Sequence, residues 1–398
     1  MFESLEPVAG DPILSLMAAF RADKRQHKID LGVGVYQDDK GQTPVMKSVK
    51  LAEAKLMELE NTKAYQGIAG DATYNKHMMA LLFGADHSIL KSNRLVTLQA
   101  PGGSGSLRVG AEVVQRARPD AKLWVGIPTW PNHIPLMGSA GFEIEQYPYY
   151  DKTTHSINIE AMMDALNRVP AGDIVLLHGC CHNPTGADLQ PEHWDQITDL
   201  ALKKGFIPFI DIAYQGLGQG LDADAYGLRM MADRLPELLV ASSCSKNFGL
   251  YRERTGSITL IAESAQQAQL VSAQAMSIAR QIYSMPPAHG ALLVSLILGD
   301  KQLRANWQAE LEEVRLRIHS MRTLLADGIN KNAAGMDFSH IKQQQGMFSF
   351  LGITSDQLNR LRDEFAIYIV GSTRVNLAGI NSNNIDYLTQ SIRTVLDS

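Results

Sequence analysis

Nearly continuous apolar runs alternate with amphipathic segments through the middle of the chain, from about residue 94 to residue 263. Six of these runs predict strands: Leu95–Leu98, Leu123–Ile127, Ile174–Leu177, Phe206–Ile212, Leu238–Ala241 and Ser257–Ile261. Strands that are covered on both faces have such sequences, because side chains on both faces are buried. The alternation of strands with helices therefore predicts an α/β fold with a mostly parallel sheet between helices.

The segments on either side of this middle section have other patterns. Leu31–Tyr36 predicts a short strand interrupted by glycines, and residues 44–61 have a helical pattern. A long amphipathic helix is expected over Lys301–Leu325. We expect residues 1–44 to form an N-terminal arm that is part of a small α/β domain. Residues 45–312 should form a large domain, and residues 313–398 the rest of the small domain.

The composition is that of an ordinary folded protein and argues against several functional classes. A chain of 398 residues with 45% hydrophobic residues can bury the cores of two domains without disulfides. The net charge of -5 argues against a surface for nucleic acid or anionic membrane, and no apolar segment approaches the roughly 20 residues of a membrane span. Only three cysteines and an acidic N-terminus unlike a signal peptide predict a cytoplasmic protein.

Polar and glycine-rich segments follow five of the predicted strands. Because ligands bind outside the carboxyl ends of parallel strands, these segments predict one shared site. The first is a glycine turn at the start of a helix, where Gly103 and Ser104 would offer backbone amides and a hydroxyl to a phosphate. Its glycines lack the GxGxxG spacing of a dinucleotide-binding turn, and the GK[ST] ending of a P-loop is missing. A turn that merely starts a helix is the alternative.

The segment Ser242–Gly256 predicts the chemistry of this site most directly. Lys246 follows an apolar strand and lies near the Ser243 hydroxyl and the cation Arg254 in the sequence. A lysine among positive charges loses its proton more easily and becomes a nucleophilic amine, while arginine and serine suit a phosphate. An imine-forming lysine beside a phosphate site predicts pyridoxal phosphate as the cofactor. A solvated loop lysine is the alternative interpretation.

Four further residues could hold the ring of such a cofactor. Asp211 ends an apolar strand, where a carboxylate needs a partner such as a cationic ring nitrogen. Tyr214 and Asn183 could hydrogen-bond to a phenolic oxygen of the ring, and Trp130 could stack on its face. The alternatives are a helix cap or salt bridge for Asp211 and a core position for Trp130.

Two arginines are candidates for substrate recognition. Arg280 and Arg374 lie outside the predicted sheet. A substrate with a carboxylate needs at least one arginine, and a substrate with two carboxylates would use both. Either residue could instead be solvated at the surface.

A metal site is not expected from the spacing of the histidines and cysteines. The residues that raise the question are His133, His178, Cys180, Cys181 and His182. Adjacent cysteines and the run CCH lack the ligand spacing of a zinc site. We therefore expect no metal ion.

Longer motifs place these residues in a known context. The motifs are HGCCHNPTG from His178, DIAYQG from Asp211, SSCSKNFGLYRERTG from Ser242, TWPNH from Thr129, GMFSF from Gly346 and TRVNLAG from Thr373. They closely resemble the class I aminotransferases, in the branch of the aspartate and aromatic amino acid aminotransferases. The resemblance covers essentially the whole chain. It implies the fold type I of pyridoxal-phosphate-dependent transferases, with a mostly parallel seven-stranded sheet in the large domain.

The resemblance also implies a role for each candidate residue. Lys246 matches the lysine that bonds to the cofactor and moves the substrate's proton, and Asp211 matches the partner of the ring nitrogen, with His133 behind it. Asn183 and Tyr214 match the groups on the phenolic oxygen. The other implied cofactor contacts are Gly103, Ser104, Trp130, Ser243, Arg254 and, from the other subunit of a homodimer, Tyr65. The implied substrate contacts are Gly34, Trp130, Asn183, Arg374 and, across the dimer, Arg280.

The implied reaction is a ping-pong transfer of an amino group from an amino acid to a 2-oxo acid, with 2-oxoglutarate as the expected acceptor. Arg280 permits aspartate and glutamate as substrates. Met285, Ala64 and Ser104 depart from the pattern of the strict aspartate enzymes, and the apolar Met285 would favour an aromatic ring. We therefore expect an aromatic amino acid aminotransferase for tyrosine and phenylalanine that also accepts aspartate and glutamate.

Three alternatives remain. Val35 and Thr43 resemble the aspartate branch, so an aspartate aminotransferase is the first. A nicotinamide dehydrogenase would suit the fold class, although the dinucleotide fingerprint is missing. The third is a regulator that keeps an aminotransferase-like body as an effector sensor and adds a DNA-binding module.

Overall fold

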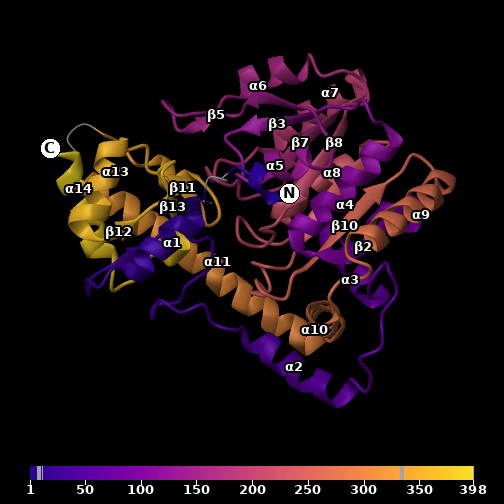
Figure 1. The fold of residues 1–398 in the computed structure, drawn as a ribbon, viewed down its shortest axis with the longest axis horizontal. Helices are drawn as coiled ribbons and strands as arrows, with labels where there is room; N and C mark the ends of the chain where they lie inside the picture. The colour runs from indigo at the N-terminus through magenta and orange to yellow at the C-terminus, as the bar shows by residue number, and fades with distance from the viewer. Residues whose placement is uncertain (7–9, 11, 332–335, 398) are drawn as a thin grey trace. The chain divides into compact units, whose positions relative to one another are not determined.

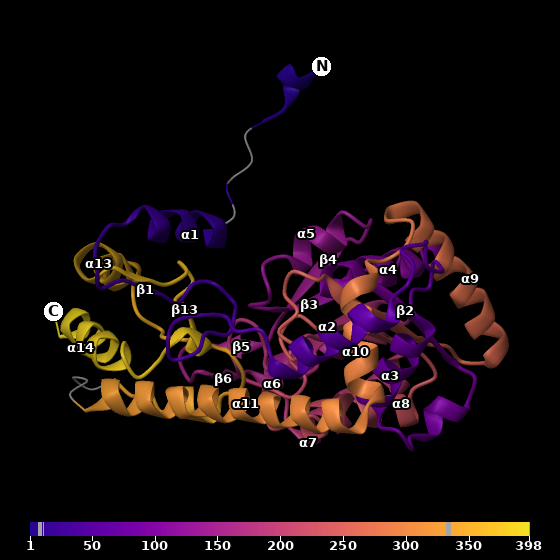
Figure 2. The same ribbon diagram turned by 90° about the horizontal axis from the view of Figure 1, so that it is seen from below.

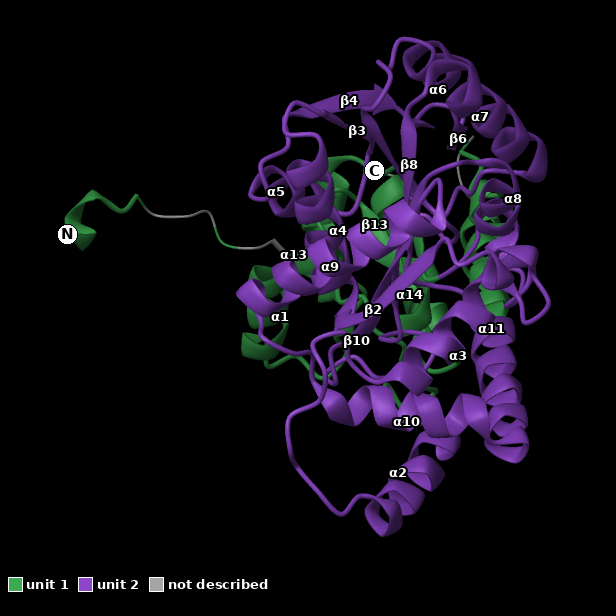
Figure 3. Cartoon of the chain, turned by 90° about the vertical axis from the view of Figure 1, so that its right-hand side faces the viewer, with its two compact units in different colours: residues 1–43, 318–343, 347–398 green, residues 44–317, 344–346 purple. Residues whose placement is uncertain are grey.

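The computed structural model describes residues 1–6, 10, 12–331 and 336–397 of the chain. The chain forms two compact units (Figure 3). Unit 1 comprises residues 1–43, 318–343 and 347–398, and unit 2 comprises residues 44–317 and 344–346. The helix α11 (Lys301–Asn330) contributes residues to both units. The long amphipathic helix predicted from Lys301 is thereby confirmed and extends beyond its predicted end.

Unit 2 is built on a seven-stranded sheet with the order β2-β10-β9-β8-β7-β3-β4 (Figure 1). Its strands are β2 (Leu95–Pro101), β3 (Leu123–Ile127), β4 (Ile144–Pro148), β7 (Ile174–His178), β8 (Ile207–Ile212), β9 (Leu238–Ser243) and β10 (Thr255–Ile261). Strand β10 is antiparallel to β2 and β9, and the other neighbours pair in parallel. The predicted α/β fold with a mostly parallel seven-stranded sheet is confirmed.

Helices cover both faces of this sheet. The helices of unit 2, besides its part of α11, are α2 (Lys47–Leu59), α3 (Ala72–Phe83), α4 (Gly102–Ala117), α5 (His133–Gly138), α6 (Ile159–Leu166), α7 (Pro191–Lys204), α8 (Tyr226–Arg234), α9 (Ala265–Ile282) and α10 (Ala288–Gly299). Figure 2 shows α4, α5 and α9 on one side of the strands and α6, α7 and α8 on the other. A two-stranded ribbon of β5 (Tyr150–Asp151) and β6 (Ser156–Ile157) lies outside the main sheet.

A close contact between a helix and the sheet occurs at Gly110 of α4. A side chain at this position would place its Cβ 2.6 Å from Cζ of Phe209 and 2.9 Å from Cδ1 of Ile258. The glycine therefore allows α4 to lie directly on strands β8 and β10. This contact is part of an apolar core that also includes Leu107 and Leu176, and it holds the first turn of α4 beside the ends of the central strands.

Unit 1 contains two short sheets and four helices of its own among the described residues. Strand β1 (Ile29–Asp30) pairs in parallel with β12 (Ile367–Tyr368), and β11 (Phe348–Phe350) pairs antiparallel with β13 (Arg374–Asn376). The helices are α1 (Pro12–Ala22), α12 (His340–Gln343), α13 (Ser355–Phe365) and α14 (Ile385–Leu396). No helix of the described residues is long and apolar enough to cross a membrane.

The strand predicted at Leu31–Tyr36 is wrong. The regular strand ends at Asp30, and the next six residues are irregular. The amide of Asn376 donates to the carbonyl oxygens of Val33 at 2.6 Å and Val35 at 2.8 Å. Because a side chain satisfies these backbone acceptors, the segment needs no neighbouring strand.

Candidate active site

A cavity of 230 Å³ lies in unit 2 where several strands of the sheet end. It is lined by Gly103, Ser104, Leu107, Trp130, His178, Asn183, Asp211, Ala213, Tyr214, Ser243, Ser245, Lys246 and Arg254. Nine of the residues that we expected at the site are in this set. Because β7, β8 and β9 are parallel neighbours, the segments that follow them meet at one edge of the sheet.

One end of the cavity is suited to an anion. Helix α4 begins at Gly102, directly after β2, so its first backbone amides are available to a ligand. Gly102 has a φ of 70°, and a Cβ there would lie 2.6 Å from Nη2 of Arg254. The glycine thus lets the guanidinium lie against the helix N-terminus. Nearby, the Ser243 hydroxyl donates to Oγ of Ser245 at 3.1 Å. These amides, hydroxyls and one cation are the groups that bind phosphate.

The amine of Lys246 lies in the same cavity, next to an aromatic ring. Lys246 is half-buried in the turn after β9, and its Nζ lies 5.0 Å from the centre of the Tyr214 ring. The Tyr214 hydroxyl accepts a hydrogen bond from Nδ2 of Asn183 at 3.5 Å. The positions of these three side chains allow a ligand in the cavity to contact the amine, the phenol and the amide at once.

Asp211 offers a buried oxygen to the cavity. The residue is 9% exposed, and its Oδ2 accepts a hydrogen bond from Nε2 of His133 at 2.9 Å. Its Oδ1 is buried and has no hydrogen-bond partner among the described residues. Burial raises the pKa of Asp211, but the hydrogen bond from His133 and the electrostatic effects of His133 and Lys246 together lower it by a larger amount, so the net pKa is below its usual value. The carboxylate is therefore ionised and can accept a hydrogen bond from a cationic ligand atom.

A chain of hydrogen bonds supports Asp211 from behind. Nδ1 of His133 contacts the hydroxyl of Thr129 at 2.7 Å, and this hydroxyl lies 3.1 Å from Nε2 of His178. Burial and the nearby His133 lower the pKa of His178 to about 3, against a smaller opposite effect of Asp211, so His178 is neutral at pH 7. The ring of Trp130 stands edge-on to His133, with 5.2 Å between the ring centres. The imidazole of His133 is thus held on three sides.

Thr129 was not among the residues that the sequence indicated. Its hydroxyl joins His133 and His178, which come from different segments of the chain. The sequence feature that could have pointed to Thr129 was its position in the motif TWPNH, four residues before His133. This spacing does not reveal the contact with His178, because that contact depends on how β3 and β7 pair in the sheet.

Two predicted residues of unit 2 lie outside the cavity lining. Tyr65 is 93% exposed and lines a separate groove of 970 Å³, together with Ala64 and Met285. Arg280 is exposed in the last turn of α9 and donates to the hydroxyl of Ser284. A single chain therefore does not bring either side chain to the cavity.

The other two predicted substrate contacts belong to unit 1. Arg374 is buried in β13, donates to the carbonyl oxygen of Gly32, and has its guanidinium 4.4 Å from the centre of the Phe348 ring. At Gly34 a Cβ would lie 3.0 Å from Cζ of the same phenylalanine. Gly34 thus leaves room for the Phe348 ring, on which the arginine packs.

Comparison with known proteins gives this arrangement a family. Residues 26–392 match the family model of aminotransferase class I and II. An aspartate aminotransferase of Haemophilus influenzae is 49% identical over 396 residues, which cover 100% of both chains. An aromatic-amino-acid aminotransferase of Pseudomonas aeruginosa is 44% identical over 394 residues, which cover 99% of this chain and 98% of that protein.

A solved structure shows the same fold with a ligand. The aromatic-amino-acid aminotransferase of Burkholderia pseudomallei, covalently bound to pyridoxal phosphate, superimposes with a TM-score of 0.97 at 42% sequence identity. The match covers 100% of this chain and 99% of that chain. The resemblance that the sequence motifs indicated is thereby confirmed over nearly the full length. The chain belongs to the class I and II aminotransferases.

Proposed function

We propose that this chain is a pyridoxal-phosphate-dependent aminotransferase that acts on tyrosine and phenylalanine, also accepts aspartate and glutamate, and uses 2-oxoglutarate as the acceptor. The observation that carries the proposal is the cavity of unit 2. It combines an amine, an ionised carboxylate with a buried oxygen that has no hydrogen-bond partner in the described part of the chain, and an anion-binding helix N-terminus. An aspartate aminotransferase is the alternative.

The groups around the cavity fit pyridoxal phosphate. The amides of Gly103 and Ser104, the Ser243 hydroxyl and the Arg254 guanidinium would hold the phosphate. At the other end, Oδ1 of Asp211 would accept a hydrogen bond from the protonated ring nitrogen, which removes the cost of burying that oxygen without a partner. When bound, this cofactor withdraws electrons from the α-carbon of an amino acid.

Lys246 has the position of a residue that moves protons at the substrate. Its Nζ would hold the cofactor in the resting enzyme and, once free, would accept the proton from the α-carbon of the substrate. Tyr214 and Asn183 would hold the phenolic oxygen of the ring, since both line the cavity together with Lys246 and contact each other. His133 would keep the Asp211 carboxylate oriented through its 2.9 Å hydrogen bond.

Charge and apolar groups support the range of substrates that we propose. Arg374 would bind the α-carboxylate, and Arg280 of the other subunit would bind the distal carboxylate of aspartate or glutamate. Met285 and Ala64 line one groove and offer apolar surface to an aromatic ring. Relatives of both specificities are similar to the chain over its full length, the aspartate enzyme at 49% and the aromatic enzyme at 44% identity.

We further propose a cytoplasmic homodimer with shared active sites. A tyrosine that is 93% exposed, Tyr65, is suited to reach a second copy of the chain. The three cysteines are buried and form no disulfide, which fits a reducing compartment. Residues 45–312 are proposed as the cofactor-binding domain, since every residue of the cavity lining falls within them, and residues 1–44 with 313–398 as the smaller domain.

The test is kcat/KM for phenylalanine, tyrosine and aspartate with 2-oxoglutarate, in the wild type and in Arg280→Leu. A hydrogen bond to a charged group contributes about 1.5–3 kcal/mol, so aspartate should lose about 10- to 150-fold in Arg280→Leu while the aromatic substrates keep their rates. Arg234→Leu is the matched control, because Arg234 is a cation at the end of α8 outside the cavity lining. A wild type that turns over phenylalanine and tyrosine orders of magnitude more slowly than aspartate would make the chain an aspartate aminotransferase.

A further inference from the structure

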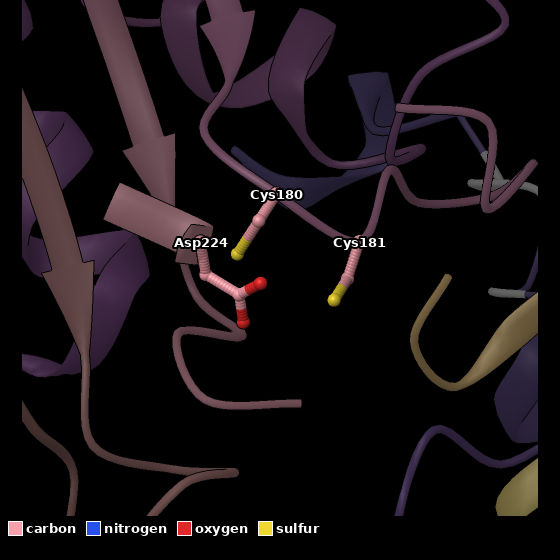
Figure 4. Close-up of side chains that lie close together, drawn as sticks. All are labelled: Cys180, Cys181 and Asp224. Atoms are coloured by element: carbon pink, nitrogen blue, oxygen red, sulfur yellow. The ribbon is translucent and has the colours of Figure 1, made fainter. Parts of the chain in front are cut away.

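Two cysteines and a carboxylate lie together outside the cofactor cavity. Cys180 and Cys181 follow β7, and Asp224 belongs to the short 3-10 helix Ala223–Ala225. One ligand atom of each side chain lies within 4.8 Å of the other two, and all three residues are buried. Figure 4 shows the two sulfurs and the carboxylate pointing toward a common space.

The carboxylate of Asp224 is held in one orientation by backbone amides. Its Oδ2 accepts from the amides of Gly216 at 2.8 Å and Gly218 at 3.0 Å, and its Oδ1 accepts from the amide of Gln219 at 2.7 Å. A carboxylate offers about four lone-pair sites, so one site remains at Oδ1. Because these hydrogen bonds already fix the carboxylate, Oδ1 can bind a cation without further loss of side-chain freedom.

The backbone that carries the cysteines is held with similar precision. The amides of Cys181 and His182 donate to the two oxygens of Asp188, each at 2.7 Å. A Cβ at Gly346 would lie 2.7 Å from Sγ of Cys181, and a Cβ at Gly218 would lie 3.1 Å from the same sulfur. Because both neighbours are glycines, their backbones can pack directly against this sulfur and fix its position.

A route to the cluster exists from the surface. Cys180 and Asp224 both line a cavity of 200 Å³ that is separate from the cofactor cavity. The cavity is large enough for water molecules. An ion can therefore reach the cluster without passing the cofactor, and a water molecule can complete its coordination.

We propose that Cys180, Cys181 and Asp224 bind one thiophilic divalent metal ion, such as Zn²⁺ or Cd²⁺, with a water molecule as the fourth ligand. Two thiolates and a carboxylate suit borderline-soft ions, and three protein ligands with one water form a known open coordination. Each thiol loses its proton as its metal–sulfur bond forms, so two protons are released per ion. Sequence spacing did not reveal this site, because Asp224 comes from a distant segment.

The three ligand atoms lie close enough together for one ion. Zinc–sulfur bonds of about 2.3 Å in a tetrahedral site place two sulfurs about 3.8 Å apart, so the ligand atoms would move together by up to about 1 Å. The longer bonds of Cd²⁺ require less movement. The ion would join two loops that reach the cofactor cavity, since Cys181 precedes Asn183 and the turn held by Asp224 follows Tyr214.

The experiment is a titration of the reduced holoenzyme with Cd²⁺, followed by the ultraviolet charge-transfer band of cadmium thiolates and by the bound cadmium per chain after equilibrium dialysis. In the wild type we expect one bound cadmium ion per chain and the appearance of the charge-transfer band. Removal of a ligand in Cys180→Ser or Cys181→Ser should weaken binding by at least about tenfold. Cys244→Ser is the matched control, because Cys244 is a buried cysteine outside the cluster and its loss should leave the affinity unchanged.

Two results would overturn the proposal. One is a wild type that shows no charge-transfer band at a large excess of Cd²⁺. The other is a Cys180→Ser/Cys181→Ser double variant that binds Cd²⁺ with the affinity of the wild type. Asp224→Asn also tests the third ligand, but it removes an acceptor of three backbone amides. The cysteine variants therefore decide the outcome.

Discussion

Replacement of Asp211 by asparagine separates the charge of the site from its shape. Asparagine is nearly isosteric with aspartate, so Asp211→Asn can still contact His133. The substitution removes the negative charge at Oδ1, the buried oxygen that has no partner among the described residues. In the proposed function this oxygen keeps the ring nitrogen of the cofactor protonated. We therefore expect Asp211→Asn to bind the cofactor but to catalyse amino transfer slowly.

The size of the loss follows from the interaction that is removed. A hydrogen bond to a charged group contributes about 1.5–3 kcal/mol. Two unit charges 4 Å apart interact by about 4 kcal/mol at an effective dielectric constant of about 20. Because about 1.4 kcal/mol corresponds to a tenfold change in rate, kcat/KM should fall by about 10- to 1000-fold.

The assay measures kcat/KM with aspartate and with phenylalanine at saturating cofactor, alongside the cofactor content from its absorbance. Asp173→Asn is the matched control. Asp173 is also buried and accepts hydrogen bonds from the amide of Lys122 at 3.0 Å and Nε1 of Trp124 at 2.9 Å, but it lies at the opposite end of β7 from the cavity. An Asp211→Asn enzyme with full cofactor content and a kcat/KM within about threefold of the wild type would refute the reasoning.

Three further predictions concern cofactor binding, pH and packing. Arg254→Leu should raise the dissociation constant of the cofactor by about tenfold or more, measured by equilibrium dialysis, because a charged hydrogen bond to its phosphate is lost. The pKa of His178 is about 3 in the folded chain and about 6.5 in the unfolded chain. Between these values only the unfolded chain binds the proton, so the free energy of unfolding falls with decreasing pH by about 1.4 kcal/mol per unit. Urea denaturation of His178→Gln should show a shallower fall over this range. Gly110→Ala should lower the free energy of unfolding by about 1–3 kcal/mol through overpacking, whereas Gly138→Ala should not, because a Cβ there meets nothing within 4 Å.

The central strands could be predicted because burial on both faces makes their sequences apolar. Strand β8 is buried at five of its six positions, and Asp211 is its one charged residue. The edge strand β4 was missed for the opposite reason. Only Tyr147 of its five residues is buried, and Glu145 and Gln146 interrupt the apolar pattern. Edge strands carry polar residues on exposed positions, so their sequences resemble loops.

The candidate site was predictable where its residues lie at the ends of strands or in the turns that follow them. Asp211 and Lys246 belong to this group, since the parallel sheet brings the ends of β8 and β9 together. Contacts between distant segments were not predictable. The hydroxyl of Thr129 contacts both His133 and His178. The side-chain amide of Asn376 donates to the carbonyl oxygen of Val33, near the other end of the chain. Such contacts depend on the folded arrangement and leave no local pattern in the sequence.

The central claim is that Lys246 forms the covalent bond with the cofactor. Its most direct test is reduction of the holoenzyme with borohydride, which makes a lysine–cofactor bond permanent, followed by digestion and mass spectrometry. We predict one modified peptide per chain, with the cofactor on Lys246. A cofactor that is found on another lysine, or one that is released unmodified from the reduced protein, would contradict the account.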